Sequence, residues 1–143
     1  RAAAAGQQFH AIATSREDRQ ASAFAARVPM LNQEIAKEVK LAWQSDVELP
    51  IAGGLKADHV LGTDKPIIII AATSATRLLE AEVIYMQYRA DNKPGYVLAV
   101  AESQIAVGKK QYERAAYYTD KAVIYQEDAF RKLVSGTATA DLH

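Results

Sequence analysis

Four consecutive isoleucines, Ile67 to Ile70, constrain the fold of this chain more than any other feature of its sequence. They stand in the segment "KPIIIIAATSATRLLEAE", directly after Pro66. β-branched residues favour strands, but the sequence shows no convincing partner strand. Proline suits the first turn of a helix, Asp64 can cap that turn, and the text after Thr73 is helical. We therefore predict one long helix over about residues 66–89, apolar on nearly all sides and buried in its first turns.

The same run is too short to cross a membrane. A spanning helix needs about 20 apolar residues. Here the apolar run ends at Ala72, and Arg77, Glu80 and Glu82 soon follow. The sequence therefore predicts no transmembrane segment in this chain. The isoleucines must be covered by protein, either by the centre of this domain or by a partner.

Hydrophobic periodicity elsewhere also favours helices. Apolar residues recur at spacings of three and four between Ala21 and Ala42, and Pro29 divides that stretch. Prolines, glycines and aspartates interrupt residues 45–66, which indicates a long loop. The predicted fold is an all-α bundle of four or five helices with a long loop at about 45–66, and the alternative is an α+β fold with a small hairpin at 81–101. The helices are expected at 15–27, 29–45, 66–89, 96–109 and 111–134.

The length of 143 residues and a hydrophobic fraction of 50% fit a single helical domain over residues 1–143. Residues 1–14 and 135–143 lack a clear period, so we expect flexible or partner-bound tails there. The chain begins with Arg1 rather than Met. This indicates a processed chain, with a signal or transit peptide removed, or a fragment, and it leaves the localisation open.

Charge and cysteine content exclude several classes of function. The chain carries 17 basic and 17 acidic residues, so its net charge is zero and it has no electrostatic signature of nucleic-acid binding. Low net charge also favours association with other proteins. The chain has no cysteine, which excludes disulfides, thiol nucleophiles and thiolate metal sites.

His59 offers the one candidate for chemistry, together with Asp58 and Asp64 in "KADHVLGTD". An imidazole with carboxylates can bind a divalent metal or act as a general base. However, no second histidine stands at helical spacing, and the nearby "AGGLKAD" lacks the Lys-Ser/Thr of a phosphate loop. We therefore predict no catalytic, metal or cofactor residues. An enzyme domain that binds a small ligand or metal through the 45–66 loop remains the alternative.

The sequence also suggests a surface that contacts other proteins. On the predicted final helix, Tyr117 and Ile124 are seven residues apart, opposite the main apolar stripe, and a second such pair flanks that stripe. Tyrosine is enriched in protein interfaces. The expected interface residues are Tyr117, Ile124, Tyr118, Tyr125, Ile67, Ile68, Ile69 and Ile70.

Residues 95–128, "GYVLAVAESQIAVGKKQYERAAYYTDKAVIYQED", resemble one tetratricopeptide unit: a helix rich in small residues, then "GKKQYERA", then "YYTDKAV". The segment from Gly108 to Tyr112 is longer than that repeat has, and one unit is visible. The resemblance implies an adaptor with a concave groove. Our leading expectation is instead a non-catalytic structural or assembly subunit that forms a homo- or hetero-oligomer with other proteins.

Overall fold

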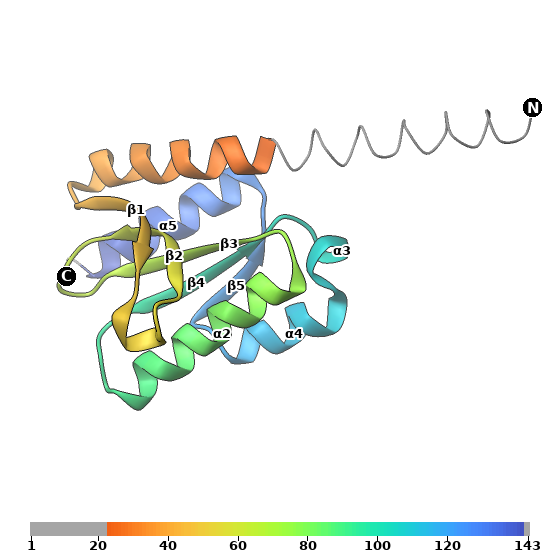
Figure 1. Cartoon of the computed structure of the whole chain (residues 1–143). Helices are drawn as coiled ribbons and strands as arrows, with labels where there is room; N and C mark the ends of the chain where they lie inside the picture. The colour runs from red at the N-terminus through yellow and green to blue at the C-terminus, as the bar shows by residue number, and fades with distance from the viewer. Residues whose placement is uncertain (1–22, 142–143) are drawn as a thin grey trace, which may run out of the picture.

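The structure is a computed structural model that describes residues 23–141, and it is built around a mixed five-stranded sheet (Figure 1). The strands lie in the order in which they occur in the chain. The first three form an antiparallel meander, whereas the last three run parallel to one another. The strands are β1 (Trp43–Glu48), β2 (Lys56–Leu61), β3 (Ile67–Ala72), β4 (Tyr96–Ala101) and β5 (Lys121–Ile124).

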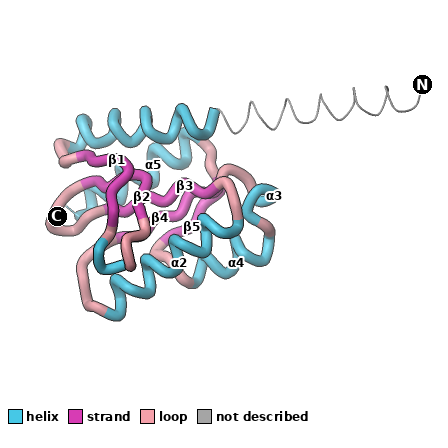
Figure 2. The backbone as a smooth tube through the Cα atoms, in the orientation of Figure 1, coloured by secondary structure: helices cyan, strands magenta, loops and turns pink. Residues whose placement is uncertain are grey.

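Helices cover both faces of this sheet. One face carries α2 (Ala75–Ala90), α3 (Gln104–Val107) and α4 (Lys109–Tyr117), which connect the parallel strands. Successive right-handed crossovers in one direction place these helices on the same face. The other face carries the N-terminal helix, which covers residues 23–39, and α5 (Glu127–Asp141) (Figure 2). The sheet therefore separates two hydrophobic cores.

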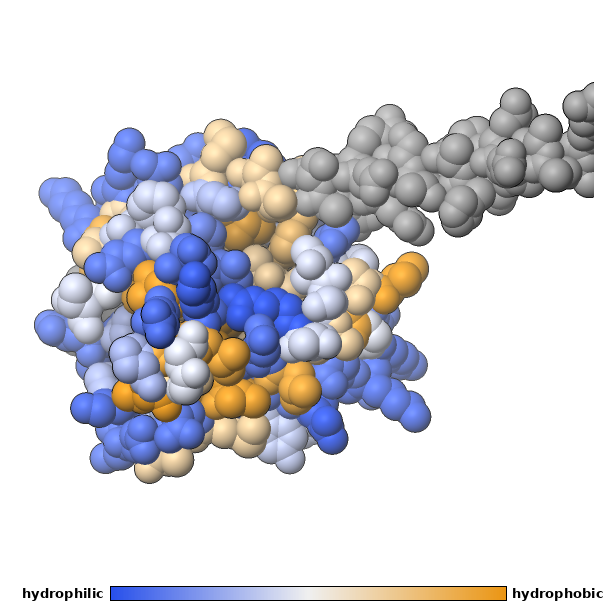
Figure 3. All heavy atoms as spheres, viewed as in Figure 1, coloured by the Kyte–Doolittle hydropathy of each residue, from blue (hydrophilic) through white to orange (hydrophobic). Residues whose placement is uncertain are grey.

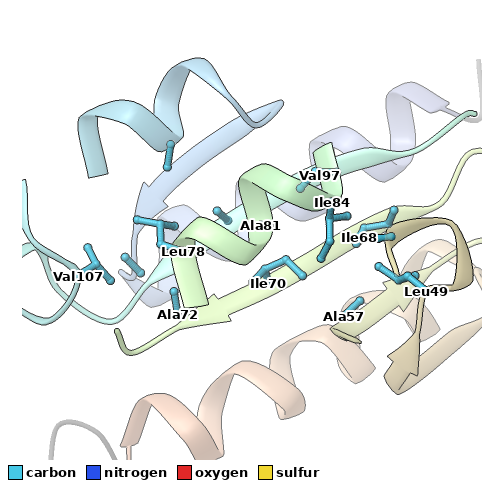
Figure 4. Packing of buried hydrophobic residues seen from close by; sticks show 14 residues of the cluster. Leu49, Ala57, Ile68, Ile70, Ala72, Leu78, Ala81, Ile84, Val97 and Val107 are labelled. Carbon is cyan, nitrogen blue, oxygen red and sulfur yellow. The ribbon is translucent and has the colours of Figure 1, made fainter. Parts of the chain in front are cut away.

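The four isoleucines form β3, the central strand, and all four side chains are fully buried. Ile68 and Ile70 pack against α2 (Figure 4). Ile67 and Ile69 pack under the N-terminal helix and α5. A strand covered on both faces reads as a continuous apolar run rather than an alternating one. The predicted helix over 66–89 is therefore wrong in its first third. Its helical part begins only at Ala75, after the Ser74 cap.

The expected all-α bundle is wrong. Residues 45–66 are not a long loop, because they contain the end of β1, a short 3-10 helix η1 (Pro50–Ala52) and β2. The helix expected at 96–109 is β4 followed by α3, and the one expected at 111–134 is interrupted by β5. These strands are short, and β4, like β3, is apolar on both faces. Periodicity could not separate it from a buried helix.

The alternative hairpin at 81–101 is wrong as well. Residues 81–89 belong to α2, and β4 pairs with β3 in parallel, from Ile67 opposite Tyr96 to Ala72 opposite Ala101. A turn at 90–95 follows α2, with Asn92 in the left-handed region at φ 53°. It connects a helix to a strand rather than two strands.

The chain ends also differ from expectation where the structure describes them. The N-terminal helix passes through Pro29 without a break and stops before Lys40, whose φ of 58° is left-handed, so Trp43 lies in β1. The helix start expected at Ser15 and the tail at 1–14 lie outside the described residues. Residues 135–141, expected in a C-terminal tail, belong to α5, and Ala138 is buried.

Candidate functional site

The outer face of α2 is the most unusual surface of the described chain. The helix begins at Ala75 because the Ser74 hydroxyl accepts the Arg77 backbone N–H at 3.1 Å. Its inner face packs on the sheet through Leu78, Ala81 and Ile84, all fully buried. A helix packed on a sheet normally has a polar outer face. On α2, part of the outer face is apolar instead, beside the polar Thr76, Glu80 and Gln87.

Five apolar residues with successive spacings of four, four, three and four make up this apolar part, which we call the α2 stripe. They fall within an arc of about 80° at about 100° per residue. Three of them are large and far from buried: the exposed fractions are 43% for Leu79, 40% for Val83 and 46% for Met86. Hydrophobic residues gather over α2 on the face seen in Figure 3. The stripe consists of Ala75, Leu79, Val83, Met86 and Ala90.

Two arginines hold α2 against the sheet, one at each end. Arg77 forms an ion pair with Asp58 of β2 at 3.0 Å, and the same carboxylate oxygen accepts the Ala71 N–H of β3 at 2.7 Å. Regular pairing of β2 with β3 ends at His59 opposite Ile69. The Asp58 side chain therefore satisfies a backbone donor that the ladder has left free.

The other end of α2 repeats this arrangement. Arg89 pairs with Asp120 at 2.9 Å, and the second oxygen of Asp120 accepts the Val97 N–H of β4 at 2.7 Å. The Arg89 guanidinium also lies 5.2 Å from the centre of the Tyr85 ring. The stripe is thus presented on a helix that is fixed at both ends.

Helix α4 lies beside α2 and extends its outer surface. The Gln111 side-chain amide donates to the buried carboxylate of Glu82, which aligns the two helices at these residues. Burial raises the pKa of Glu82, and the nearby Arg114 partly opposes that rise. The outer side of α4 is exposed and carries Lys110, Glu113 and Tyr117, of which Tyr117 is 80% exposed.

The structure does not bring the predicted interface residues together. Ile67 to Ile70 are buried by the chain's own helices. Tyr117 ends α4 and Tyr118 follows it, both exposed, whereas Ile124 lies on β5, so no helical spacing relates Tyr117 to Ile124. Tyr125 packs inward, with its ring 5.3 Å from that of Phe24 and 6.0 Å from that of Phe130.

Of the three residues proposed for chemistry, Asp58 and His59 line the same cavity, whereas Asp64 is not among the residues that line it. Asp58 is held by Ala71 and Arg77, as described above. His59 is buried and stacks on Trp43, with ring centres 6.0 Å apart. Asp64 lies in the turn before β3. Within residues 23–141, no group of three or more His, Cys, Asp or Glu side chains could hold a metal ion.

His59 borders a cavity of about 240 Å³ between the N-terminal helix and the ends of β2 and β3. Phe24, Val28 and Thr73 also line it. The Nδ1 atom of His59 is buried and has no hydrogen-bond partner. Burial lowers the pKa of His59, although the charge of Asp58 acts in the opposite direction. The ring is therefore held neutral at physiological pH.

The sequence contained the signal for the α2 stripe, but periodicity alone led to a different interpretation. Residues 75–90 read as apolar on nearly all sides, which predicted burial within a bundle. In the structure one apolar side meets the sheet, and the other stays exposed because no helix of the described chain covers it. Sequence spacing cannot say which of two apolar sides is covered.

No described helix has the length and apolar character needed to span a membrane. Comparisons with family models, with curated proteins and with solved structures gave no match.

Proposed function

We propose that this chain is a non-catalytic protein-interaction domain of an assembly and that it binds its partner through the α2 stripe. One observation carries the proposal: Leu79, Val83 and Met86 remain 40–46% exposed on a helix whose other side is fully packed. Scattered exposed apolar residues are normal, but a contiguous row on one helix is typical of a binding surface.

Three further features support an interaction role. The chain has no net charge, so little electrostatic repulsion opposes association. Arg77 and Arg89 hold α2 in place, so little conformational entropy is lost when its face is covered. Asp58, one of the candidate residues for chemistry, is instead occupied by its contacts with Ala71 and Arg77.

Photo-cross-linking in the producing cells tests this proposal. A photoreactive residue at Val83 is expected to give one discrete covalent adduct with a protein, and Leu79→Glu in the same chain should abolish it. The control places the photoreactive residue at Lys132, which is exposed on α5. Equal, diffuse labelling from both positions, or an adduct that survives Leu79→Glu in a folded chain, would contradict the proposal.

A second candidate function is the binding of a small ligand in the cavity beside His59. The unpartnered Nδ1 atom favours it, because buried polar atoms normally have a partner. Such a ligand would carry an apolar body with one hydrogen-bonding group. Small fragments of this kind should shift the NMR signals of the His59 ring, and Ala25→Trp, at the cavity wall, should remove the shift. Unchanged His59 signals across the fragments would argue against this function.

A further inference from the structure

The arrangement of residues on α2 and α4 identifies the partner more closely. We infer that the α2 stripe binds the same stripe of a second copy of this chain, with the two α2 helices antiparallel and related by a two-fold axis near Val83. This inference rests on the proposed function, because it concerns the occupant of the same surface.

The stripe is nearly symmetric about its own centre. Ala75 and Ala90 stand at its ends, Leu79 and Met86 lie inside them, and Val83 is in the middle. In an antiparallel pair, Leu79 of one copy therefore lies opposite Met86 of the other, and each Ala75 lies opposite Ala90. Small residues meet at both ends, which lets the helices approach closely, and large residues fill the centre. An interface of this kind is self-complementary, as a two-fold axis requires.

The charges on α4 fit the same axis. The two-fold axis crosses α2 near Glu82 and Val83. Because Glu82 accepts a hydrogen bond from Gln111, the same axis passes α4 near residues 111 and 112. Lys110 and Glu113 are placed symmetrically about that point. In the dimer, Lys110 of each copy therefore lies opposite Glu113 of the other. A two-fold axis parallel to the helices would instead place the two α4 helices on opposite sides of the α2 pair, so that Lys110 and Glu113 would have no partner on α4 of the other copy.

The size of the surface also requires both helices. A stable interface buries about 800 Å² on each partner, which is more than three half-exposed side chains of one helix supply. The outer side of α4 adds exposed surface that includes Tyr117. We therefore expect a layer of α2 and α4 from one copy to pack on the same layer of the other.

Cysteine cross-linking tests the inference directly, because the chain has no cysteine of its own. The purified full chain should have twice its mass of 15.6 kDa by light scattering, and Val83→Glu should halve the measured mass without unfolding the chain. When Leu79→Cys and Met86→Cys chains are mixed and oxidised, the disulfide between the two variants should predominate. Two Leu79 positions would be separated by about 10 Å along antiparallel helices, which is too far for a disulfide.

A charge exchange checks the register. Lys110→Glu and Glu113→Lys should each weaken the dimer about two- to fivefold, and the double variant should restore it. A wild-type chain that stays monomeric at millimolar concentration overturns the inference, as do disulfides that form mainly between identical variants. If the chain is monomeric but the Val83 photoadduct contains another protein, the inferred homodimer is wrong and the proposed function stands. If Val83 gives no adduct, the homodimer and the proposed function are both wrong.

Discussion

The carboxylate of Asp58 lies 3.0 Å from the guanidinium of Arg77, and this ion pair joins the end of the β2–β3 ladder to the first turn of α2. The same oxygen accepts the Ala71 N–H at 2.7 Å. Asp120 and Arg89 form the equivalent contact at the last turn of α2. In both places an aspartate accepts the N–H of a neighbouring strand and forms an ion pair with an arginine of α2. This pair of contacts sets the position of the α2 stripe.

Removing the Asp58 side chain should therefore cost more than a surface ion pair. Asp58→Ala leaves the Ala71 N–H without its partner, so we expect the free energy of unfolding to fall by about 1–3 kcal/mol in urea denaturation. Glu38→Ala is the matched control, because Glu38 forms an exposed pair with Arg131 at 3.4 Å and should change stability by less than about 0.5 kcal/mol. Equal losses from the two variants would contradict this role for Asp58.

At the other end of α2, the backbone contact should matter more than the charge. Asp120→Ala removes the acceptor of the Val97 N–H and should destabilise the fold by about 1–3 kcal/mol. Asp120→Asn keeps an oxygen acceptor for the Val97 N–H and should therefore lose less stability than Asp120→Ala. Arg89→Ala should lose least, because the Arg89 side chain is 65% exposed. Thermal denaturation of the three variants gives this order, and a larger loss for Arg89→Ala than for Asp120→Ala would show that the ion pair dominates.

The central strand should be intolerant of truncation. Ile70 is fully buried between the sheet and α2, so Ile70→Ala should lower the free energy of unfolding by about 2–5 kcal/mol, and Ile70→Val by about 0.5–1.5 kcal/mol. Ile105→Ala is the control for loss of the same atoms at the surface, because Ile105 is 96% exposed. Urea denaturation measures all three. A loss at Ile105 as large as that at Ile70 is incompatible with the burial described here.

Stability should decrease with acid because of His59. Burial lowers the pKa of His59 in the folded chain below its ordinary value of 6.5. The unfolded chain therefore binds the proton more readily, and stability present above pH 6.5 is lost as the pH falls below that value. His59→Phe keeps a ring on Trp43 but cannot titrate, so its loss of stability between pH 7.5 and pH 5.5 should be smaller than that of the wild type. An identical loss in both chains would mean that the pKa of His59 is the same in the folded and the unfolded chain.

The contribution of Glu82 to stability should have the opposite dependence on pH. Burial raises its pKa above the ordinary value of 4.5, so its contribution to stability is greatest below pH 4.5 and is lost as the pH rises through the folded-state value. Glu82→Gln stays neutral and can still accept from Gln111, so it should be more stable than the wild type at pH 7. Glu80→Gln, on the same helix, is the control. Lower stability of Glu82→Gln at pH 7 would show that the charge on Glu82 is favourable.

Elements with a local signal could be predicted from the sequence, and elements that depend on distant partners could not. The spacing of the residues after Thr73 predicts a helix there, and α2 is that helix. The sequence predicts helix for β3 and β4 because Ile67 to Ile70 and "YVLAVA" are apolar on both faces. Their strand conformation depends on pairing with each other across about 30 residues.

The candidate site shows the same division. The apolar character of residues 75–90 is visible in the sequence, and so is the absence of cysteine and of net charge. Which apolar side of α2 stays exposed depends on where the sheet lies. His59 and Asp58 are neighbours in the sequence, yet one stacks on Trp43 under the N-terminal helix and the other pairs with Arg77 of α2, because successive residues of a strand point to opposite faces.

The sequence by itself determined that the four isoleucines had to be covered by protein and that α2 would be apolar on more than one side. Only the tertiary structure decided that Ile67 to Ile70 form the middle strand of a sheet with helices on both faces, and that Leu79, Val83 and Met86 remain uncovered. The physical reason is that the hydrophobicity of the residues determines how much apolar surface must be buried. Strand pairing between distant parts of the chain determines which apolar surface is buried.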